Sequence, residues 1–174
     1  MSKTLLVAGG AGYIGSHVCH VAAQHGFAPV VVDRIEPAEG ALEAYRLGIS
    51  RAFPLEICDI ADEQRIREVI ARYKPCAAIC LAALIDVEQS TREPALYWEH
   101  NYIKFGRFLS TLVGAGIRHL VFSSTAAVYG AHSGARLLSE NDPLAPAHPY
   151  GQSKLACELL LQGTSANHVV APGL

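Results

Sequence analysis

The chain lacks the features that mark several classes of protein. It has no cluster of lysine and arginine, and its 14 basic and 16 acidic residues give a net charge of -2, which argues against a nucleic-acid-binding surface. Its longest apolar run, residues 76–85, is too short to span a bilayer. Residues 1–3 lead directly into the first predicted strand, so no signal peptide is expected.

Cysteine and histidine also lack the spacing of a disulfide framework or a metal site. The cysteines are odd in number and include no Cys-x-x-Cys pair; they are Cys19, Cys58, Cys76, Cys80 and Cys157. We interpret them as small core residues in a reducing compartment, which predicts a cytoplasmic protein. The eight histidines show no His-x-x-x-His spacing, so no metal is expected. With 174 residues, 51% of them hydrophobic, the chain is predicted to form one globular domain.

What the sequence does contain is a glycine-rich turn near its start. Residues 5–8 form a short apolar run typical of a buried strand. After the turn, apolar residues share one helix face: Ile14, Val18, Val21 and Ala22. The turn itself holds Gly9, Gly10, Gly12 and Gly15, which fit the fingerprint of dinucleotide-binding domains. A pyrophosphate can approach a backbone only where no Cβ intrudes, and the following helix offers N–H groups and the positive end of its dipole.

Asp33 ends the second predicted strand, residues 29–33, about 20 residues beyond the glycine turn. A carboxylate at this place can accept both hydroxyls of an adenosine ribose and repel a 2′-phosphate, which favours NAD over NADP. Arg34 follows directly and softens that repulsion. The alternative interpretation of Asp33 is an ordinary acidic residue in the turn after a strand.

Strands and helices alternate along the rest of the chain. We expect further strands at residues 51–57, 76–81, 118–122 and 168–171, helices at residues 41–47, 62–73, 94–114 and 150–161, and a surface loop at residues 129–149. This alternation implies right-handed crossovers and a doubly wound parallel sheet in a three-layer α/β/α fold. Ligands of such sheets bind at the carboxyl ends of the strands.

Small and polar residues stand at those strand ends. Asp59 follows the third strand, where it can bind an adenine amino group or, alternatively, cap the helix at residues 62–73. Ala82 and Ala83 follow the fourth strand. They either let the backbone pass close to a bound ribose or simply pack beneath a helix.

Tyr150 and Lys154 lie four residues apart and therefore on one helix face. A lysine beside a tyrosine lowers the pKa of the phenol, and a phenolate nearer neutrality can act as general base for a sugar or alcohol hydroxyl. Thr125, or Ser124 beside it, can hold that hydroxyl by a hydrogen bond. Tyr-x-x-x-Lys often arises by chance as a solvated pair, but here it follows a strand that ends in Ser-Ser-Thr.

Taken in order, these motifs resemble the extended short-chain dehydrogenase/reductase superfamily, whose NAD-binding domains have a Rossmann-type fold, and within it the UDP-glucose 4-epimerases. The resemblance covers residues 1 to about 161 and rests on residues 9–17, 33, 58–60, 81–84, 122–130 and 149–154. It implies NAD as cofactor and epimerisation at C4 of a UDP-hexose, UDP-glucose or UDP-galactose, through a 4-keto sugar. Tyr150 would be the base, Lys154 its activator and a ribose contact, and Thr125 the partner of the hydroxyl.

The resemblance also implies a set of contacts to cofactor and substrate. The cofactor-binding residues would be Gly9, Gly12, Tyr13, Ile14, Gly15, Asp33, Arg34, Asp59, Ile60, Leu81, Ala82, Ala83, Asn101, Ser123, Tyr150 and Lys154. Thr125 and Tyr150 would contact the sugar. Pairing of long helices between two copies would give a homodimer.

The chain also departs from the family pattern. The family's Asn-x-x-Gly-Thr reads Asn101-Tyr-Ile-Lys-Phe105 here, with His100 before it, and Ile85 stands where a lysine is common. Family members continue into a C-terminal domain that grips the nucleotide-sugar, whereas this chain has about half the expected length. Residues 162–174 are interpreted as a short tail, and that domain is expected to be absent.

The strand that ends in Thr125 bears on the choice among related activities. Dehydratases and decarboxylases of the superfamily usually place an acidic residue just before the Val-Tyr-Gly of residues 128–130, but that stretch reads Thr125-Ala126-Ala127 here. This favours epimerisation over dehydration. Two alternatives stay open: an NAD-binding module without turnover, and a short NAD-dependent reductase of another carbonyl or sugar-nucleotide substrate.

Overall fold

A six-stranded parallel sheet runs through the computed structural model, which describes residues 3–34, 52–130, 137–164 and 167–171. The strands are β1 (Lys3–Ala8), β2 (Phe27–Asp33), β3 (Leu55–Ile57), β4 (Ala77–Cys80), β5 (His119–Ser123) and β6 (Asn167–Ala171). They pair in the order β3-β2-β1-β4-β5-β6, and every pair is parallel. The strand order reverses between β1 and β4, so this is the predicted doubly wound, Rossmann-type α/β fold.

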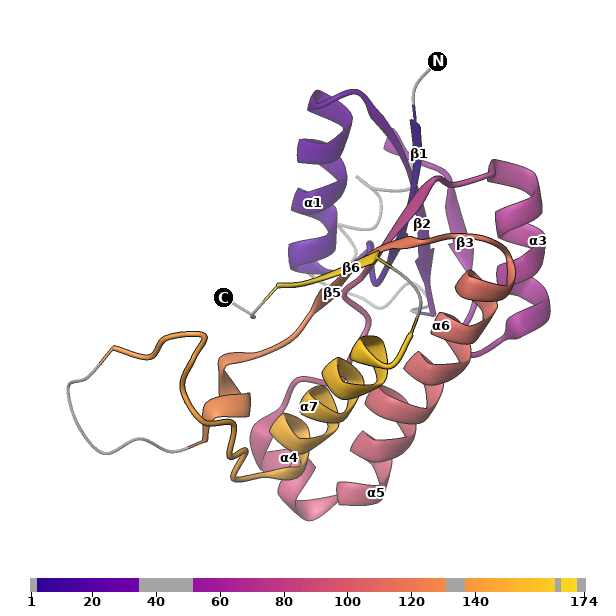
Figure 1. Ribbon diagram of the computed structural model, residues 1–174. Helices are drawn as coiled ribbons and strands as arrows, with labels where there is room; N and C mark the ends of the chain where they lie inside the picture. Colours follow the sequence, from indigo (N-terminus) through magenta and orange to yellow (C-terminus); the bar gives the residue numbers. More distant parts are fainter. Residues whose placement is uncertain (1–2, 35–51, 131–136, 165–166, 172–174) are drawn as a thin grey trace.

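Helices cover both faces of the sheet. They are α1 (Tyr13–Gln24), α3 (Glu63–Tyr73), α4 (Val87–Arg92), α5 (Pro94–Tyr97), the π-helix η1 (Trp98–Ile103), α6 (Lys104–Gly114), the 3₁₀-helix η2 (Ala126–Tyr129) and α7 (Pro149–Gln162). The helices α3, α6 and α7 lie on one face, and α1 lies on the other (Figure 1). Within the described ranges, no helix has the length and apolar character needed to cross a membrane.

The apolar strands form a core on each side of the sheet, as parallel sheets require. The larger core includes Leu6, Phe108 and Leu112, which are almost fully buried. The rings of Phe105 and Phe122 pack with centroids 4.6 Å apart, which joins α6 to β5. The smaller core lies beneath α1 and comprises Leu5, Val7, Ala11, Cys19 and Val31.

The cysteines follow the predicted pattern with one exception. Burial of Cys19, Cys80 and Cys157 raises the pKa of each thiol, to about 12, 11 and 12, so these thiols stay protonated. Cys58 is half-buried, and Cys76 is exposed, which corrects the expectation that all five are core residues. The exposed Cys76 lies just before β4, and its thiol donates to the carbonyl oxygen of Thr4 at 3.3 Å.

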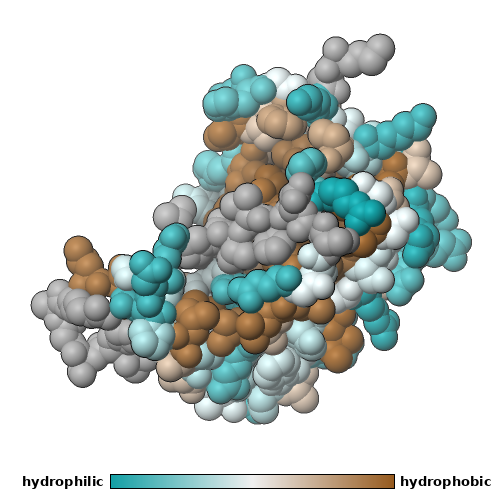
Figure 2. All heavy atoms as spheres, viewed as in Figure 1, coloured by the Kyte–Doolittle hydropathy of each residue, from teal (hydrophilic) through white to brown (hydrophobic). Residues whose placement is uncertain are grey.

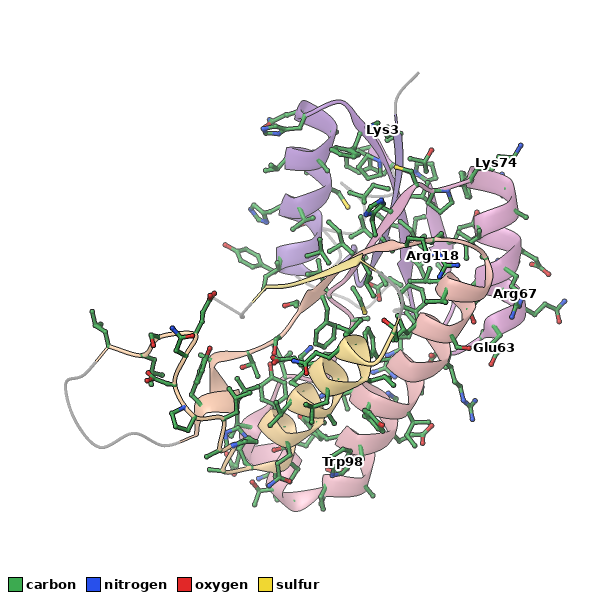
Figure 3. The ribbon with its side chains drawn as sticks, in the orientation of Figure 1. Lys3, Glu63, Arg67, Lys74, Trp98 and Arg118 are labelled. Carbon is green, nitrogen blue, oxygen red and sulfur yellow. The ribbon has the colours of Figure 1, made fainter. Side chains whose placement is uncertain are left out.

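Local signals explain where α3 begins and ends. Asp62 caps the helix by accepting a hydrogen bond from the backbone N–H of Arg65 at 3.0 Å. Lys74 is the C-cap residue that ends the helix, and its backbone has the left-handed conformation, at φ 48°. The charged residues Glu63, Arg67 and Lys74 lie on the outer side of this helix, away from the sheet (Figure 3).

The predicted strands form, and apart from the third their ends lie within two residues of the predicted ones. The third strand covers residues 55–57 instead of 51–57. Pro54 accepts a hydrogen bond from the N–H of Val31 but has no N–H to donate, so the regular ladder starts after it. The sixth strand forms at residues 167–171, where a strand was predicted. The predicted helix at residues 41–47 lies outside the described residues.

The long helix predicted from Pro94 is not continuous. It begins at Pro94 and ends at Gly114, but the π-helix η1 separates α5 from α6. The wider turns of η1 contain Asn101, whose side chain is bonded outside the helix, and π-bulges commonly mark such functional positions. Two further helices, α4 and η2, were not predicted. Asp86 caps α4 by accepting from the N–H of Gln89, and this Asp-x-x-Gln spacing is the signal that indicates a helix start.

Candidate functional site

A cavity of about 320 Å³ opens at the carboxyl ends of the strands, where the strand order reverses. Its lining residues are Gly9, Gly12, Val32, Asp33, Arg34, Cys58, Asp59, Ile60, Leu81, Ala82, Ala83, Leu84, His100 and Lys104. The structure thus brings together most of the predicted cofactor-binding residues. Those outside the lining are Tyr13, Ile14, Gly15, Asn101, Ser123, Tyr150 and Lys154.

The glycine turn forms the floor of this cavity. Gly9 has a φ of +79°, and its N–H donates to the carbonyl of Val32 at 2.8 Å. A Cβ on Gly9 would lie 2.6 Å from the backbone nitrogen of Ala82, and one on Gly15 would lie 2.2 Å from the carbonyl oxygen of Gly9. Both glycines are therefore required for backbone packing. Gly12 has room for a Cβ, whose nearest neighbour would lie at 3.6 Å, so packing does not require a glycine there. The missing side chain instead leaves space in the cavity that Gly12 lines.

The amino end of α1 faces this turn. Gly12 is the N-cap residue and has no side chain to bond the first N–H groups of the helix, so the positive end of the helix dipole is directed at the cavity floor. The side chains of Tyr13 and Ile14 are exposed and do not line the cavity. Any contact that these two residues make with a ligand there goes through their main chain.

Asp33 and Arg34 form one wall, at the end of β2. Asp33 is buried, and its Oδ2 accepts a hydrogen bond from the N–H of Ala11 at 3.1 Å, which ties the acid to the glycine turn. Arg34 reaches across to His100 and donates from Nη1 to Nδ1 at 3.2 Å. Burial lowers the pKa of His100, and the charges of Lys104 and Arg34 lower it further, which suits a neutral ring that accepts this bond.

Asp59 and Lys104 form another part of the cavity lining. The Oδ1 of Asp59 accepts from the N–H of Ala61 at 2.9 Å and its Oδ2 from the ammonium of Lys104. Burial by itself would raise the pKa of Asp59, but these hydrogen bonds and the charge of Lys104 outweigh it and lower the pKa. The alternative role of Asp59 as cap of the following helix is not observed, because Asp62 caps α3.

His100 and Lys104 line the cavity, although the sequence analysis noted them only as departures from the family pattern. They are four residues apart on adjoining helical segments, so they face the same way. That spacing within the helix predicted at residues 94–114 is the signal that could have grouped them.

Asn101 lies between the cavity wall and the helix α7. Its Oδ1 accepts from the N–H of Leu84 at 2.8 Å, and its Nδ2 donates to the Leu84 carbonyl at 3.0 Å and to Ser153 Oγ at 3.3 Å. Ser153, fully buried, donates in turn to the carbonyl of Tyr150 at 2.8 Å. Asn101 thus positions the loop after β4 relative to α7. Ser153 was not identified from the sequence.

The predicted catalytic helix begins against η2. His148 caps it by accepting from the N–H of Gly151 at 3.3 Å, and a Cβ on Gly151 would lie 2.8 Å from the carbonyl oxygen of Ala127. Thr125 caps η2, accepting from the N–H of Ala127 at 3.2 Å, so Thr125 and Tyr150 come from two helix starts in direct contact. The Tyr150 ring stacks on His148, with centroids 6.2 Å apart.

Lys154 is buried beneath this surface, with 3% of the residue exposed. Its Nζ lies 4.1 Å from the centroid of the Phe122 ring. Burial lowers the pKa of Lys154, although Cys80, Cys157 and Glu158 act in the other direction. The fold therefore holds Lys154 at a position where burial disfavours the charged form of its side chain.

Ser124 and Thr125 were both candidates for holding a substrate hydroxyl, and the structure distinguishes them. Ser124 is buried and donates its hydroxyl to the carboxylate of Glu158 on α7. This bond fastens the end of β5 to α7 and leaves Thr125 as the half-buried hydroxyl at the strand end. Glu158 was not identified from the sequence, because a single acid on a predicted helix gives no sign of its partner.

The fold and the cavity together define a nucleotide-binding domain of the Rossmann type that carries a Tyr-x-x-x-Lys helix. A family model agrees: the NAD dependent epimerase/dehydratase family matches residues 5–172. The chain belongs to this family. The match extends past residue 161, where the resemblance in sequence motifs stops.

Several named proteins are similar to this chain in sequence. The UDP-glucose 4-epimerase of Rhizobium meliloti (strain 1021) is 42% identical over 161 residues, which are 92% of this chain and 47% of that protein. The UDP-glucose 4-epimerase of Azospirillum brasilense is 38% identical over 167 residues, 96% of this chain and 46% of that protein. The chain therefore spans about half the length of the relatives it matches.

Solved structures give the same result. The UDP-glucose 4-epimerase from Brucella ovis, in complex with NAD, superposes with a TM-score of 0.87 at 30% identity and covers 98% of this chain and 51% of that one. The Thermus thermophilus enzyme, also in complex with NAD, gives a TM-score of 0.86 at 28% identity over 97% of this chain and 54% of that one.

We predict that Gly15→Ala and Gly12→Ala have different effects on stability. The added methyl of Gly15→Ala meets rigid backbone, so it should lower the free energy of unfolding by about 1–3 kcal/mol or more. Gly12→Ala has space for its methyl and should change stability by less than about 1 kcal/mol. Urea unfolding followed by circular dichroism measures both, and equal stability of the two variants would contradict the packing of α1 on the turn.

We predict that Lys154→Met stabilises the ligand-free chain at pH 7, by about 1–4 kcal/mol, because it removes a buried charge. The unfolded chain holds the lysine proton up to a pKa near 10.5, whereas the folded chain loses it at lower pH. Between those two values folding releases a proton, so wild-type stability should rise with pH and the difference should shrink. The exposed Lys3→Met is the control, and thermal unfolding from pH 7 to 10.5 tests the trend. A difference that grows with pH would refute it.

Proposed function

We propose that this chain is the cofactor-binding part of an NAD-dependent enzyme that interconverts epimers at C4 of a UDP-hexose, with UDP-glucose and UDP-galactose as the expected pair. The observation that carries this proposal is the joint placement of a nucleotide-sized cavity and the Thr125, Tyr150 and Lys154 set at the carboxyl edge of one sheet. Residues 1–161 would form the NAD-binding domain. The part that grips the nucleotide-sugar would lie outside these 174 residues.

The chain's own residues fit NAD. Gly12 presents bare backbone to the cavity, and the positive end of α1 is directed at the same place, as a pyrophosphate requires. Asp33 lies at the end of β2, where a carboxylate can accept ribose hydroxyls. The small residues Ala82 and Ala83 leave room above the end of β4. The cavity volume lies in the lower part of the range for small-molecule sites, which suits the adenosine half of the cofactor.

The proposed chemistry assigns a separate task to each residue. When bound, NAD would supply a hydride acceptor for C4 of the sugar and then a donor of that hydride to the opposite face. Tyr150 takes the proton of the 4-hydroxyl, and Thr125 orients that hydroxyl by a hydrogen bond. Burial penalises the charge of the Lys154 ammonium. Lys154 is one helical turn from Tyr150, so negative charge developing on the phenol would favour the ammonium, and the two groups would promote proton transfer together.

A second candidate follows from the length of the chain. Since it spans about half of its relatives, it can act as an NAD-binding module without turnover, or as a short reductase that uses the same tyrosine and lysine on another carbonyl. A homodimer and a cytoplasmic location belong to the proposal as well.

We predict that Asp33→Ala weakens NAD binding about tenfold or more, because a charged hydrogen-bond acceptor for the ribose is lost. The same change should reduce the preference for NAD over NADP, since the repulsion of a 2′-phosphate disappears. Titration of both cofactors by fluorescence or calorimetry measures this. The exposed carboxylate of Glu68 lies outside the cavity, and Glu68→Ala is the control. An unchanged preference in Asp33→Ala would overturn the ribose assignment.

We predict that Tyr150→Phe leaves NAD affinity within about twofold and lowers sugar turnover by about 10²–10⁴, because the base is lost while the cavity is intact. The assay uses the chain co-expressed with the C-terminal half of the Rhizobium meliloti epimerase, follows reduced cofactor after UDP-galactose is added, and separates UDP-glucose by chromatography. Normal turnover by Tyr150→Phe would refute the base role. NAD binding without any sugar turnover in the wild type would favour the module, and NADH oxidation by other carbonyls would favour the reductase.

A further inference from the structure

The polar side chains that line the cavity are bonded to one another in pairs. His100 accepts a hydrogen bond from Arg34. The ammonium of Lys104 donates to the carboxylate of Asp59. Apolar residues gather elsewhere, at the surface over α1 and the strands beside it, where Val21 is 52% exposed (Figure 2). The pair of Lys104 and Asp59 has no equivalent in the family motif, which has a glycine at the position of Lys104.

Both members of this pair keep unused bonding capacity. The side chain of Lys104 is 19% exposed and that of Asp59 is 30% exposed, so a ligand in the cavity can reach them. An ammonium has three N–H groups, and in the described part of the chain that of Lys104 bonds only Asp59. Each oxygen of Asp59 accepts one bond, from Ala61 or from Lys104, and can accept another. The pair therefore offers spare donors beside spare acceptors.

The pair also lies next to the residue proposed to hold the ribose. The strand β3 pairs with β2, and the N–H of Cys58 donates to the carbonyl of Asp33 at 3.0 Å. Asp59 is thus one residue beyond a direct contact with Asp33, and both line the same cavity. Since the purine of a dinucleotide is bonded directly to this ribose, the base would come within reach of Asp59 and Lys104.

An ammonium changes which purine such a site can bind. Adenine presents an amino donor at its six-position beside the acceptor N7, whereas hypoxanthine and guanine present the acceptor O6 beside N7. A carboxylate accepts from the amino group but repels O6. Asp59 alone would therefore select adenine. The Lys104 ammonium, which only donates, supplies the bond that O6 requires.

We propose that Lys104 is a specificity-determining residue of the cofactor site, which together with Asp59 lets the site accept a 6-oxopurine dinucleotide as well as the adenine one. This inference rests on the proposed NAD site and deepens it, because it names the part of the cofactor that this pair contacts. The alternative is that the pair only fastens α6 to the loop after β3. A bond of that kind would affect stability and leave the choice of base unchanged.

The test is calorimetric titration of the full chain with NAD and with nicotinamide hypoxanthine dinucleotide, which differs from NAD at the purine six-position. The readout is the ratio of the two dissociation constants, hypoxanthine form over NAD. Lys104→Met removes the ammonium, and Asp59→Asn removes the charge of the carboxylate at the same shape. Arg107→Met is the matched control, because Arg107 is an exposed cation on the next turn of α6 and does not line the cavity. Circular dichroism checks the fold of each variant.

We expect the ratio to rise at least about fivefold in Lys104→Met, because the carboxylate then faces O6 without a donor beside it. The ratio should fall in Asp59→Asn, since the amide does not repel O6 and the ammonium is released from its partner. It should stay within about twofold in Arg107→Met. The opposite directions of the first two shifts keep the test valid if either variant does not fold.

An unchanged or lower ratio in Lys104→Met, or a higher one in Asp59→Asn, would overturn the proposal. An unchanged ratio together with lower stability would show that Lys104 only fastens α6. In both cases NAD still binds, so the proposed cofactor site would stand. A wild-type chain that binds neither dinucleotide would reject the proposed cofactor site and this inference with it.

Discussion

The close contact of backbone with backbone at the glycine turn determines the arrangement of the whole site. The carbonyl of Gly9 lies where any side chain on Gly15 would have to be, so α1 rests directly on the end of β1. The same turn is bonded to β2 through Val32 and Asp33 and touches the end of β4 at Ala82. The ends of β1, β2 and β4 and the start of α1 therefore meet at the glycine turn, where no side chain projects. The cavity lies directly above this turn.

The charges around that cavity are balanced. Asp33 and Asp59 contribute negative charge and Arg34 and Lys104 contribute positive charge, and Lys104 is paired directly with Asp59. A doubly charged pyrophosphate would therefore gain little from net side-chain charge. It would instead be attracted by the amino end of α1 and by backbone N–H groups, whose partial positive charge does not require an ionised side chain. This explains how a chain with a net charge of -2 can carry a site for an anionic ligand.

The sequence predicted the fold and the strand-end residues because both follow from short-range patterns. Glycine spacing, alternation of strands and helices, and the register of Asp33 all act within about thirty residues, the length of one βαβ unit. What it could not predict depends on contacts between distant segments. The bond between Ser124 and Glu158, the pair of Lys104 and Asp59, and the outward apolar face of α1 each require knowledge of what packs where. The π-helix η1 was not predicted either, and the bonds of its residue Asn101 to the loop after β4 again join segments distant in sequence.

The hydrogen bonds of Asn101 limit what position 101 can accept. The side chain offers an acceptor to one N–H and two donors to a carbonyl and a hydroxyl, all within one planar amide. Aspartate would keep the acceptor but face the Leu84 carbonyl with like charge. Leucine, of similar shape, would leave the half-buried N–H and carbonyl of Leu84 without these bonds. Only an amide of this length joins the three partners. A single side chain thus links the loop after β4, which lines the cavity, to the helix that bears Tyr150.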